Sequence, residues 1–399
     1  MTCLDPEEVQ NKYTHFLLDP GDYVVSSSGT LGRIAEVFEE DLPCMLNTSV
    51  IRFRPLDSER LDRRYLKAFL RSDHFNEQIL AHANGSAQLN YGPTHLKQMS
   101  MPLPPLSAQK VIGDTLGALD DHIDNLRQTN ATLEAIAQAL FKSWFVDFDP
   151  VRAKVEGREP EGMDPATAAL FPSEFEDSEL GPIPKGWLVT TLANEIEAER
   201  GLSYKGSGLT GWGNGVPMHN LNSVLEGGGY KYAGIKYYSG DYKDRHVAVA
   251  GDIIVANTEQ GHHHRLIGFP AMVPSHYSTG LFSHHLYRVR PRATSVVNAE
   301  WIFWCLKVPS VRDQIIGCAN GSTVNMLKPA GLQIPQFILP TRDLCSAFAS
   351  IAGVLRRQSE SNVNRLDTLS DLRDVLLPRL ISGKLRLPEA EREIEAATA

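Results

Sequence analysis

Polar side chains that could exchange hydrogen bonds with the edges of nucleic-acid bases gather in four short, glycine-containing loops of this chain. Arg favours guanine and Asn or Gln favours adenine, whereas Ser and Thr suit either. The candidates are Ser27, Ser28, Thr30 and Arg33; Gln88, Asn90 and Tyr91; Asn257, Thr258, Gln260, His262, His264 and Arg265; and Ser322 and Asn325. Each loop could equally be an ordinary polar turn, so base contact is a hypothesis for every one of these residues.

The histidine run 262–264 and the pair His284 and His285 raise the question of a metal site, because imidazole is a common zinc ligand. Neighbouring residues of a strand point to opposite faces, so only His262 and His264 could converge. No Cys or Asp lies close to them in the sequence. We therefore expect contact with DNA or solvent at these histidines, and no metal.

Motifs that would give the chain a reaction of its own are missing from the sequence. It contains no GxxxxGKS/T phosphate loop, no HExxH and no GxSxG. It also lacks an NPPY- or DPPY-like motif of the kind that adenine methyltransferases carry. We expect that this chain alone is not an enzyme and binds no cofactor.

An internal repeat must position the four loops. The tetrapeptide ANGS occurs at residues 83–86 and again at 319–322, and other features recur at nearly the same spacing. The matching segments are Leu18–Ile34 with Val247–Ile267, and Asn47–Phe75 with Phe282–Ile315. The chain therefore consists of two copies of one unit. Because ANGS is common to both, it is expected to be a structural turn or a phosphate contact rather than a base reader.

Each copy shows short apolar strands separated by Gly, Ser and Asn loops, followed by helical periodicity, which predicts an α+β fold. In the first copy an amphipathic helix is expected over about 63–81. From Leu116 to Trp144 apolar residues alternate at spacings of three and four, and the second copy repeats the pattern with a more polar seam. A seam this narrow predicts two long helices that pack mainly against each other. Asn130 and Asn362 either fix the register of this seam or face water near a frayed end.

Composition limits the other possibilities. The net charge is −9, which does not favour phosphate binding, and only the second copy is basic. Residues 181–340 carry 14 Lys and Arg against 10 Asp and Glu, whereas residues 1–103 carry 10 against 14. Local patches or a partner subunit would have to supply much of the attraction to DNA. The five cysteines form no CxxC pair, and no apolar run could span a bilayer, so we expect a cytoplasmic protein without membrane contact.

The segment between the copies carries the most specific signal. From "LFKSWFVDFDPVRAKVEG" through "FPSEFEDSELGPIPKGW" it resembles the central conserved region of the specificity (S) subunit of type I restriction-modification systems, and the two-copy plan resembles that family over nearly the whole chain. The resemblance implies two target recognition domains in tandem, separated by two long helices packed as an antiparallel coiled coil. It also implies a non-catalytic subunit that recognises a bipartite site in double-stranded DNA. Two methyltransferase (M) subunits and restriction (R) subunits would dock on it, and S-adenosylmethionine, ATP and Mg would belong to these partners.

On this basis the expected boundaries are a first target recognition domain at 1–103, a conserved helix and connector at 104–180, a second domain at 181–340, and a C-terminal helix with a polar tail at 341–399. One departure from the family is visible. About seventy residues lie between the start of "GPIPKGW" and Gly251, but only twenty precede Gly21. The first domain is therefore expected to lack roughly its opening third.

Aromatic residues at the end of the first long helix are candidates for subunit docking, with packing inside the chain as the alternative; they are Phe141, Trp144, Phe145 and Phe148. The rival to DNA recognition is a truncated or silenced scaffold that binds partner subunits without recognising a sequence. The target sequence, its spacer length and the competence of the short first domain cannot be deduced from the residues, because base recognition depends on placing side chains within hydrogen-bond distance.

Overall fold

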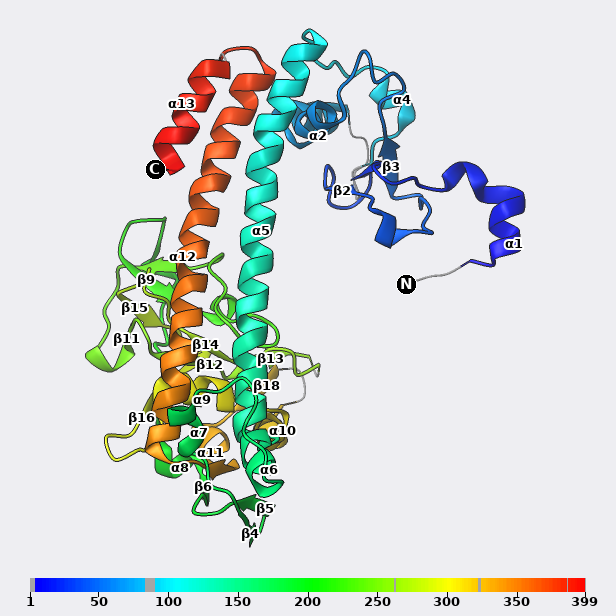
Figure 1. Cartoon of the computed structure of the whole chain (residues 1–399). Coiled ribbons are helices and arrows are strands. Elements are labelled where there is room, and N and C mark those ends of the chain that lie inside the picture. The colour runs from blue at the N-terminus through cyan, green and yellow to red at the C-terminus, as the bar shows by residue number, and fades with distance from the viewer. Residues whose placement is uncertain (1–3, 83–89, 262, 322–323, 386, 399) are drawn as a thin grey trace. The chain divides into compact units, whose positions relative to one another are not determined.

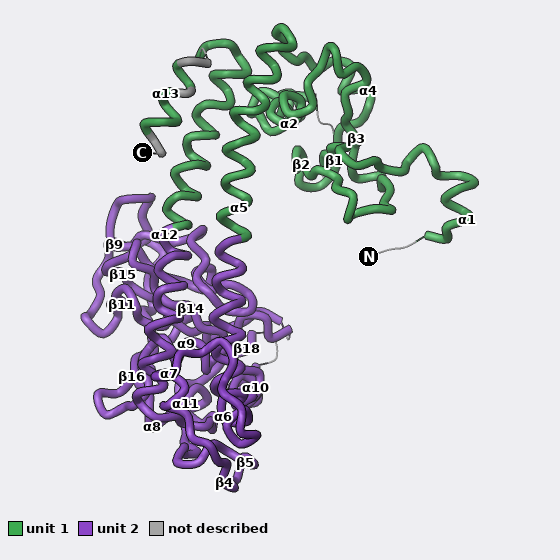
Figure 2. Tube along the Cα trace, in the orientation of Figure 1, with its two compact units in different colours: residues 1–128, 362–399 green, residues 129–361 purple. Residues whose placement is uncertain are grey.

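The computed structural model describes residues 4–82, 90–261, 263–321, 324–385 and 387–398 (Figure 1). The chain forms two compact units, which Figure 2 distinguishes by colour. Unit 1 comprises residues 1–128 and 362–399, and unit 2 comprises residues 129–361. Two 40-residue helices, α5 (Leu106–Phe145) and α12 (Arg342–Ile381), contribute to both units.

Unit 1 is built around a small antiparallel sheet with strand order β2-β1-β3. Its strands are β1 (Tyr23–Ser26), β2 (Ile34–Glu36) and β3 (Val50–Phe53). Its helices and helical turns, besides the parts of α5 and α12, are α1 (Pro6–Glu8), η1 (Val9–Tyr13), η2 (Thr14–Phe16), η3 (Glu39–Asp41), α2 (Arg63–Arg71), α3 (Asp73–His82), α4 (Pro93–Leu96) and α13 (Leu387–Thr398).

The single helix expected over 63–81 is in fact two helices, α2 and α3. The reason is Ser72, a buried residue whose extended backbone ends α2. Its Oγ accepts a hydrogen bond from the Phe75 backbone N–H at 3.2 Å, which is the bond that an N-cap residue makes. Asp62 caps α2 in the same way, through the backbone N–H of Tyr65. The pattern of apolar residues continues across the break, so periodicity alone does not reveal it.

Unit 2 is larger and contains several sheets, with strand orders β14-β12-β16-β7, β11-β15-β9-β10-β8, β13-β18-β17, β19-β6 and β4-β5. Its strands are β4 (Phe175–Ser178), β5 (Gly181–Pro184), β6 (Leu188–Thr191), β7 (Ile196–Arg200), β8 (Leu209–Thr210), β9 (Val216–His219), β10 (Lys236–Tyr238), β11 (Val247–Val249), β12 (Ile253–Ala256), β13 (Thr258–Gln260), β14 (Pro270–Met272), β15 (Thr279–Phe282), β16 (Leu286–Pro291), β17 (Ala319–Asn320), β18 (Val324–Leu327) and β19 (Gln336–Leu339). Its shorter helices and turns are α6 (Asp149–Val155), α7 (Pro165–Ala169), α8 (Leu192–Glu195), η4 (Gly206–Gly208), η5 (Leu221–Ser223), η6 (Asp244–His246), α9 (Ala299–Cys305), α10 (Pro309–Gly317) and α11 (Pro329–Gln333).

The two long helices pack together within each unit. In unit 1, Leu116 and Ile123 of α5 share a buried cluster with Leu369 and Leu376 of α12. In unit 2 the ring of Phe141 lies 5.2 Å from that of Phe348. Also in unit 2, the Asn130 side-chain amide donates to the Ser359 backbone carbonyl at 3.3 Å. In unit 2, therefore, a residue further along α5 contacts a residue nearer the start of α12, which means that the two helices run antiparallel.

This arrangement confirms the predicted fold class. Of the two interpretations of Asn130, the seam position is the one observed, because its side chain bonds across to the other helix. Single polar residues in such a seam fix the register of paired helices. Of the helices within the described ranges, none combines the length and hydrophobicity required of a membrane span.

The duplication extends to individual hydrogen bonds. β1 pairs with β3 in the register in which β12 pairs with β16, so that Val24 lies opposite Arg52 as Ile254 lies opposite Arg288. In unit 1 the carboxylate of Asp22 accepts bonds from the Asp19 backbone N–H at 2.9 Å and from the Arg54 guanidinium at 2.5 Å.

The same frame recurs in unit 2. There the carboxylate of Asp252 accepts bonds from the Val249 backbone N–H at 2.8 Å and from the Arg290 guanidinium at 2.6 Å. The Gly-Asp turn and an Arg, which directly follows β3 in unit 1 and lies within β16 in unit 2, therefore form one local frame that is present twice and anchors the start of each sheet.

Candidate nucleic-acid interface

The loop that joins β12 to β14 in unit 2 holds six of the fifteen candidates, and Asn325 lies in β18, which pairs with β13 of this loop. The structure divides these candidates into buried and exposed residues. Asn257, Thr258 and Asn325 are at most 4% exposed. The Asn257 side-chain amide donates to the His284 carbonyl at 3.0 Å, and that of Asn325 donates to the Gly261 carbonyl at 2.8 Å. The Thr258 hydroxyl lies 2.9 Å from His285 Nδ1. These side chains bond within the unit and hold the loop in place.

The exposed candidates of this loop are Gln260 and Arg265, while His264 is half-buried. His264 adopts a left-handed backbone conformation with φ of 52°, which places a sharp bend directly before Arg265. The Arg265 guanidinium lies 3.7 Å from the carboxylate of Glu226, and both side chains are largely exposed. An exposed ion pair of this kind is weak. Arg265 is therefore available to exchange Glu226 for an anionic ligand.

Two residues that the sequence did not single out shape the loop from beneath. The buried carboxylate of Glu259 accepts backbone N–H bonds from Arg265 at 2.7 Å, Leu266 at 3.3 Å and Ile267 at 3.2 Å. A carboxylate with three backbone donors fixes a turn strongly, because hydrogen bonds to a charged group are stronger than neutral ones.

Arg312 of α10 completes the support. Its guanidinium donates to the carbonyls of Ile267, at 2.7 Å, and His264. It also stacks on the Phe269 ring at 3.3 Å from the ring centroid. Burial lowers the pKa of Arg312 to about 10, so the side chain is still charged at neutral pH. Glu259 and Arg312 thus bond to the same stretch of backbone, one to its N–H groups and the other to its carbonyls, and together they fix the backbone that carries His264 and Arg265.

The equivalent loop of unit 1 follows β1 and shows the same division. Ser27 and Tyr91 are buried. The Ser27 backbone carbonyl accepts the Tyr91 N–H at 3.2 Å, and burial raises the pKa of Tyr91 to about 12. Ser28 is half-buried and forms a β-bridge with Asn90, whereas Thr30, Arg33 and Asn90 are exposed.

A serine holds this loop as Glu259 holds the other. The Ser26 hydroxyl donates to the Thr30 carbonyl at 2.5 Å and accepts the Arg33 backbone N–H at 2.9 Å. The loop thus presents Thr30 and Arg33 on a fixed turn. Gln88, His262 and Ser322 lie outside the described residues, so their candidacy stays a prediction from sequence. Base contact also stays a prediction for every other candidate.

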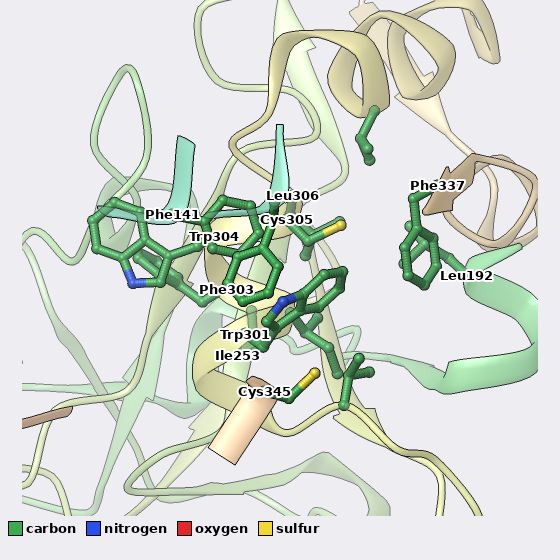
Figure 3. Close-up of a cluster of buried hydrophobic side chains, with 14 of the residues drawn as sticks. Phe141, Leu192, Ile253, Trp301, Phe303, Trp304, Cys305, Leu306, Phe337 and Cys345 are labelled. Atoms are coloured by element: carbon green, nitrogen blue, oxygen red, sulfur yellow. The ribbon is translucent and has the colours of Figure 1, made fainter. Parts of the chain in front are cut away.

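The four docking candidates lie in the interior of unit 2. Phe141, Trp144, Phe145 and Phe148 are each at most 6% exposed. The Phe141 and Phe145 rings lie 5.4 and 5.8 Å from that of Trp301. Figure 3 shows Phe141 and Trp301 within this cluster, near Cys305 and Phe337. Packing inside the chain, the alternative raised from the sequence, is therefore observed for all four, and docking stays a prediction.

A pocket of about 320 Å³ opens beside this aromatic cluster. Phe141, Phe145, Phe148 and Trp301 line it, and Ser310, Gln314 and Gln336 add polar groups. Exposed apolar side chains at Val146 and Leu180 complete its wall.

Comparison with known proteins agrees with this architecture. Residues 6–135 match the model of the type I restriction modification DNA specificity domain. The chain is 26% identical over 337 residues to the type I restriction enzyme HindI specificity subunit of Haemophilus influenzae, covering 73% of this chain and 70% of the relative. It is 23% identical over 327 residues to the MjaIX specificity subunit of Methanocaldococcus jannaschii, covering 82% and 69%.

A solved structure shows the same fold. The S subunit of a type I restriction-modification system from M. genitalium superposes with a TM-score of 0.52 at 15% identity, covering 92% of this chain and 84% of that one. At this identity the likeness concerns the fold alone. Taken with the domain match and the two curated relatives, it shows that the chain is similar to specificity subunits of type I restriction-modification systems.

Proposed function

We propose that this chain is the DNA-recognition subunit of a type I restriction-modification complex, and that each unit contacts one half of a bipartite site in double-stranded DNA. The observation that carries the proposal is a duplicated frame with different loops. The Asp22–Arg54 and Asp252–Arg290 pairs anchor equivalent sheets, yet the exposed residues that follow differ. A constant scaffold with variable exposed side chains suits two recognition modules for two different sequences.

Within the proposal, the exposed residues of the two loops and the half-buried His264 contact DNA, and the buried ones keep the loops in shape. The contacting residues are Thr30, Arg33 and Asn90 in unit 1 and Gln260, His264 and Arg265 in unit 2. Arg33 and Arg265 suit a guanine or a phosphate, and Gln260 and Asn90 suit an adenine. Asn257, Thr258 and Asn325 then act through the loop rather than on the bases.

The proposed partners are two M subunits and the R subunits of the complex. The chain has no enzymatic role in this proposal, and S-adenosylmethionine, ATP and Mg are bound by the partners. The net charge of −9 supports a division of labour in which the M subunits supply much of the positive charge that DNA binding requires. The proposed location is the cytoplasm, where the DNA and the partner subunits are.

A second candidate function is a scaffold that binds M without recognising a sequence. The observation that favours it is the smaller frame of unit 1, whose sheet has three strands where the equivalent sheet of unit 2 has four. The two functions are separated by measuring binding of the M-bound chain to specific and random duplexes over a range of salt concentrations. Recognition predicts a preference for one duplex that persists as the salt concentration rises. A scaffold would bind both duplexes with equal affinity and would release both as the salt concentration rises.

A further inference from the structure

A pair of adjacent histidines, His284 and His285, forms the tight turn between β15 and β16 of unit 2. The centroids of their rings lie 3.9 Å apart. The His284 backbone N–H donates to the Leu202 carbonyl at 2.9 Å, and the His285 carbonyl accepts the Asn257 N–H at 3.0 Å. The turn is thus held by backbone bonds to two other segments, and both histidine side chains remain partly exposed.

The pair adjoins the strand that carries one of the proposed DNA contacts. His285 Nδ1 lies 2.9 Å from the hydroxyl of Thr258 in β13. Side chains two residues apart on a strand point to the same face. The exposed Gln260 therefore projects from the face of β13 that the histidine pair adjoins, whereas Glu259, between Thr258 and Gln260, is buried on the other face.

Two permanently charged side chains lie beside the pair. Arg200, the exposed last residue of β7, lies opposite Tyr287 in the strand register. Lys236 of β10 is half-buried, and its Nζ donates to the Tyr204 hydroxyl at 3.3 Å. The Tyr204 ring in turn lies 6.0 Å from that of His284. Strands β7 and β10 therefore each add a positive charge near the histidine turn.

These four side chains, which we call the basic cluster, are Arg200, Lys236, His284 and His285. Burial lowers the pKa of His285, and repulsion from the other three members lowers it further. An anion among them would reverse this effect, because an opposite charge favours the protonated imidazole. A bound anion would therefore be stabilised by two fixed charges and by protonation of the histidines.

Within the described ranges of the chain, the basic cluster has no counter-ion. None of its four members forms an ion pair with a carboxylate there, whereas Arg290, further along β16, is paired with Asp252 at 2.5 Å. His284 Nδ1 is also buried without a hydrogen-bond partner in that part of the chain. A buried polar atom without a partner is costly, and like charges without a counter-ion repel one another. The cluster is therefore suited to an anionic ligand.

A metal ion fits the basic cluster poorly, although histidine is a common metal ligand. Lys236 and Arg200 are charged at neutral pH and would repel a cation. Among the described residues, no group of three or more His, Cys, Asp or Glu side chains is placed to hold a metal. The charges favour instead a phosphate, for which Lys and Arg are the usual partners.

We propose that the basic cluster holds a backbone phosphate of the DNA whose base Gln260 contacts. This inference rests on the proposed function, in which unit 2 binds one half of the DNA site. A phosphate contact carries no sequence information, but it fixes the register and the orientation of the duplex. The cluster is thus a positioning site, and Gln260 beside it is a residue that distinguishes bases.

The test is DNA binding by the M-bound chain, measured on the specific duplex and on a random duplex over a range of salt concentrations. Lys236→Met keeps the length of the side chain and removes its charge. Both duplexes are expected to bind about tenfold more weakly, and the slope of log K against log salt concentration is expected to fall in magnitude by about 1. The matched control is Lys185→Met, which removes the same charge from an exposed lysine that pairs with Glu174, and it should change neither quantity.

The pH dependence of binding provides a second readout. Because phosphate favours the protonated imidazole, the affinity of the parent for both duplexes should rise as the pH falls from 8 to 6. His285→Gln keeps a side chain that can bond to Thr258 but cannot be protonated, and it should lose about threefold of this rise. The difference between parent and variant separates His285 from His264, which is present in both. Urea midpoints from tryptophan fluorescence at each pH verify that unit 2 is folded.

Three results would overturn the proposal. They are a salt slope that Lys236→Met and Arg200→Gln both leave unchanged, a pH dependence in His285→Gln equal to that of the parent, and a loss of affinity confined to the specific duplex, which would assign the cluster to base recognition. Failure of the proposed function would be distinct. The parent would then bind both duplexes with the same affinity, while a phosphate contact would still appear as a smaller salt slope in Lys236→Met.

Discussion

Units 1 and 2 share a frame but differ in how that frame is covered. In unit 2 the sheet containing β12 is buried on both faces: Ile253 and Val255 belong to the aromatic cluster, and Ile254 belongs to a second cluster with Phe282. In unit 1, Tyr23 and Val25 are buried on one face, while Val24 on the other is partly exposed. The local geometry of the frame is therefore maintained without the second layer. Most of the difference in the free energy of unfolding between unit 1 and unit 2 should come from the layers that cover the frame.

The largest expected effect is at the centre of the aromatic cluster. Trp301→Ala should lower the free energy of unfolding of unit 2 by about 3–5 kcal/mol, because it removes a large, fully buried side chain from a close-packed site. All five tryptophans lie in unit 2, so tryptophan fluorescence in urea reports this unit alone. Trp212→Ala is the matched control: Trp212 is 85% exposed, and its removal should cost less than about 0.5 kcal/mol. Equal effects would mean that the cluster is not the core of the unit.

Acid should destabilise unit 2 through buried histidines. Burial lowers the pKa of His219 to about 4, and it lowers those of His246 and His285 as well. An unfolded histidine titrates near 6.5. The stabilisation that neutral His219 contributes is therefore complete above pH about 6.5 and is lost as pH falls towards 4, because the unfolded chain takes up the proton more readily.

For His219 the full loss in the free energy of unfolding is roughly 3 kcal/mol, because its pKa falls from 6.5 to about 4 and one pKa unit corresponds to about 1.36 kcal/mol. The measurement is the urea midpoint of unit 2 at pH 7 and pH 5, in the parent and in His219→Phe. The variant should show a smaller difference between the two pH values. An unchanged pH dependence would exclude His219 as a source of the acid sensitivity.

The duplicated frame predicts similar costs in the two units. Asp252→Ala and Asp22→Ala should each cost about 2 kcal/mol, since each removes the acceptor of a backbone N–H and a carboxylate paired with a partly buried guanidinium. Arg54 keeps its second partner, Asp19, at 2.8 Å, so the cost in unit 1 should be the smaller of the two. Fluorescence measures the first and hydrogen exchange of β1 measures the second. A cost in only one unit would show that the frame stabilises the sheet only where a second layer covers it.

The smallest effect concerns the loop surface. Arg265→Ala should weaken binding of specific DNA by the M-bound chain by about 1 kcal/mol, roughly fivefold, and leave stability nearly unchanged because its ion pair with Glu226 is exposed. Arg158→Ala removes the same charge from the connector, where Arg158 pairs with exposed Glu156, and should not affect DNA binding. Equal losses for both would indicate a general charge effect.

Sequence pattern predicted the features that depend on spacing. The repeat, the α+β class, the paired helices and the aromatic connector all follow from periodicity or recurrence, which neighbouring residues determine. The break at Ser72 was missed because a capping serine does not interrupt the apolar pattern. The burial of Asn257 and Asn325 was also missed. A polar residue in a loop has the same sequence signature whether it bonds to its own backbone or faces solvent.

The roles of Glu259 and Arg312 in fixing the β12–β14 loop could not be predicted from the sequence for another reason. Glu259 is close to the loop, but Arg312 reaches His264 from 48 residues away. A lone Arg in an amphipathic helix usually indicates a solvated face. Only the fold brings it under the loop and against the Phe269 ring.

The central claim is that each unit recognises its own half of a bipartite DNA site. The most direct test is to replace residues 188–338 with the equivalent segment of another specificity subunit, express the chimera with its M subunit, and sequence the methylated sites of the cell. The account predicts that one half of the methylated site changes and the other half stays as in the parent. A site in which both halves change, or a parent site that is not bipartite, would contradict it.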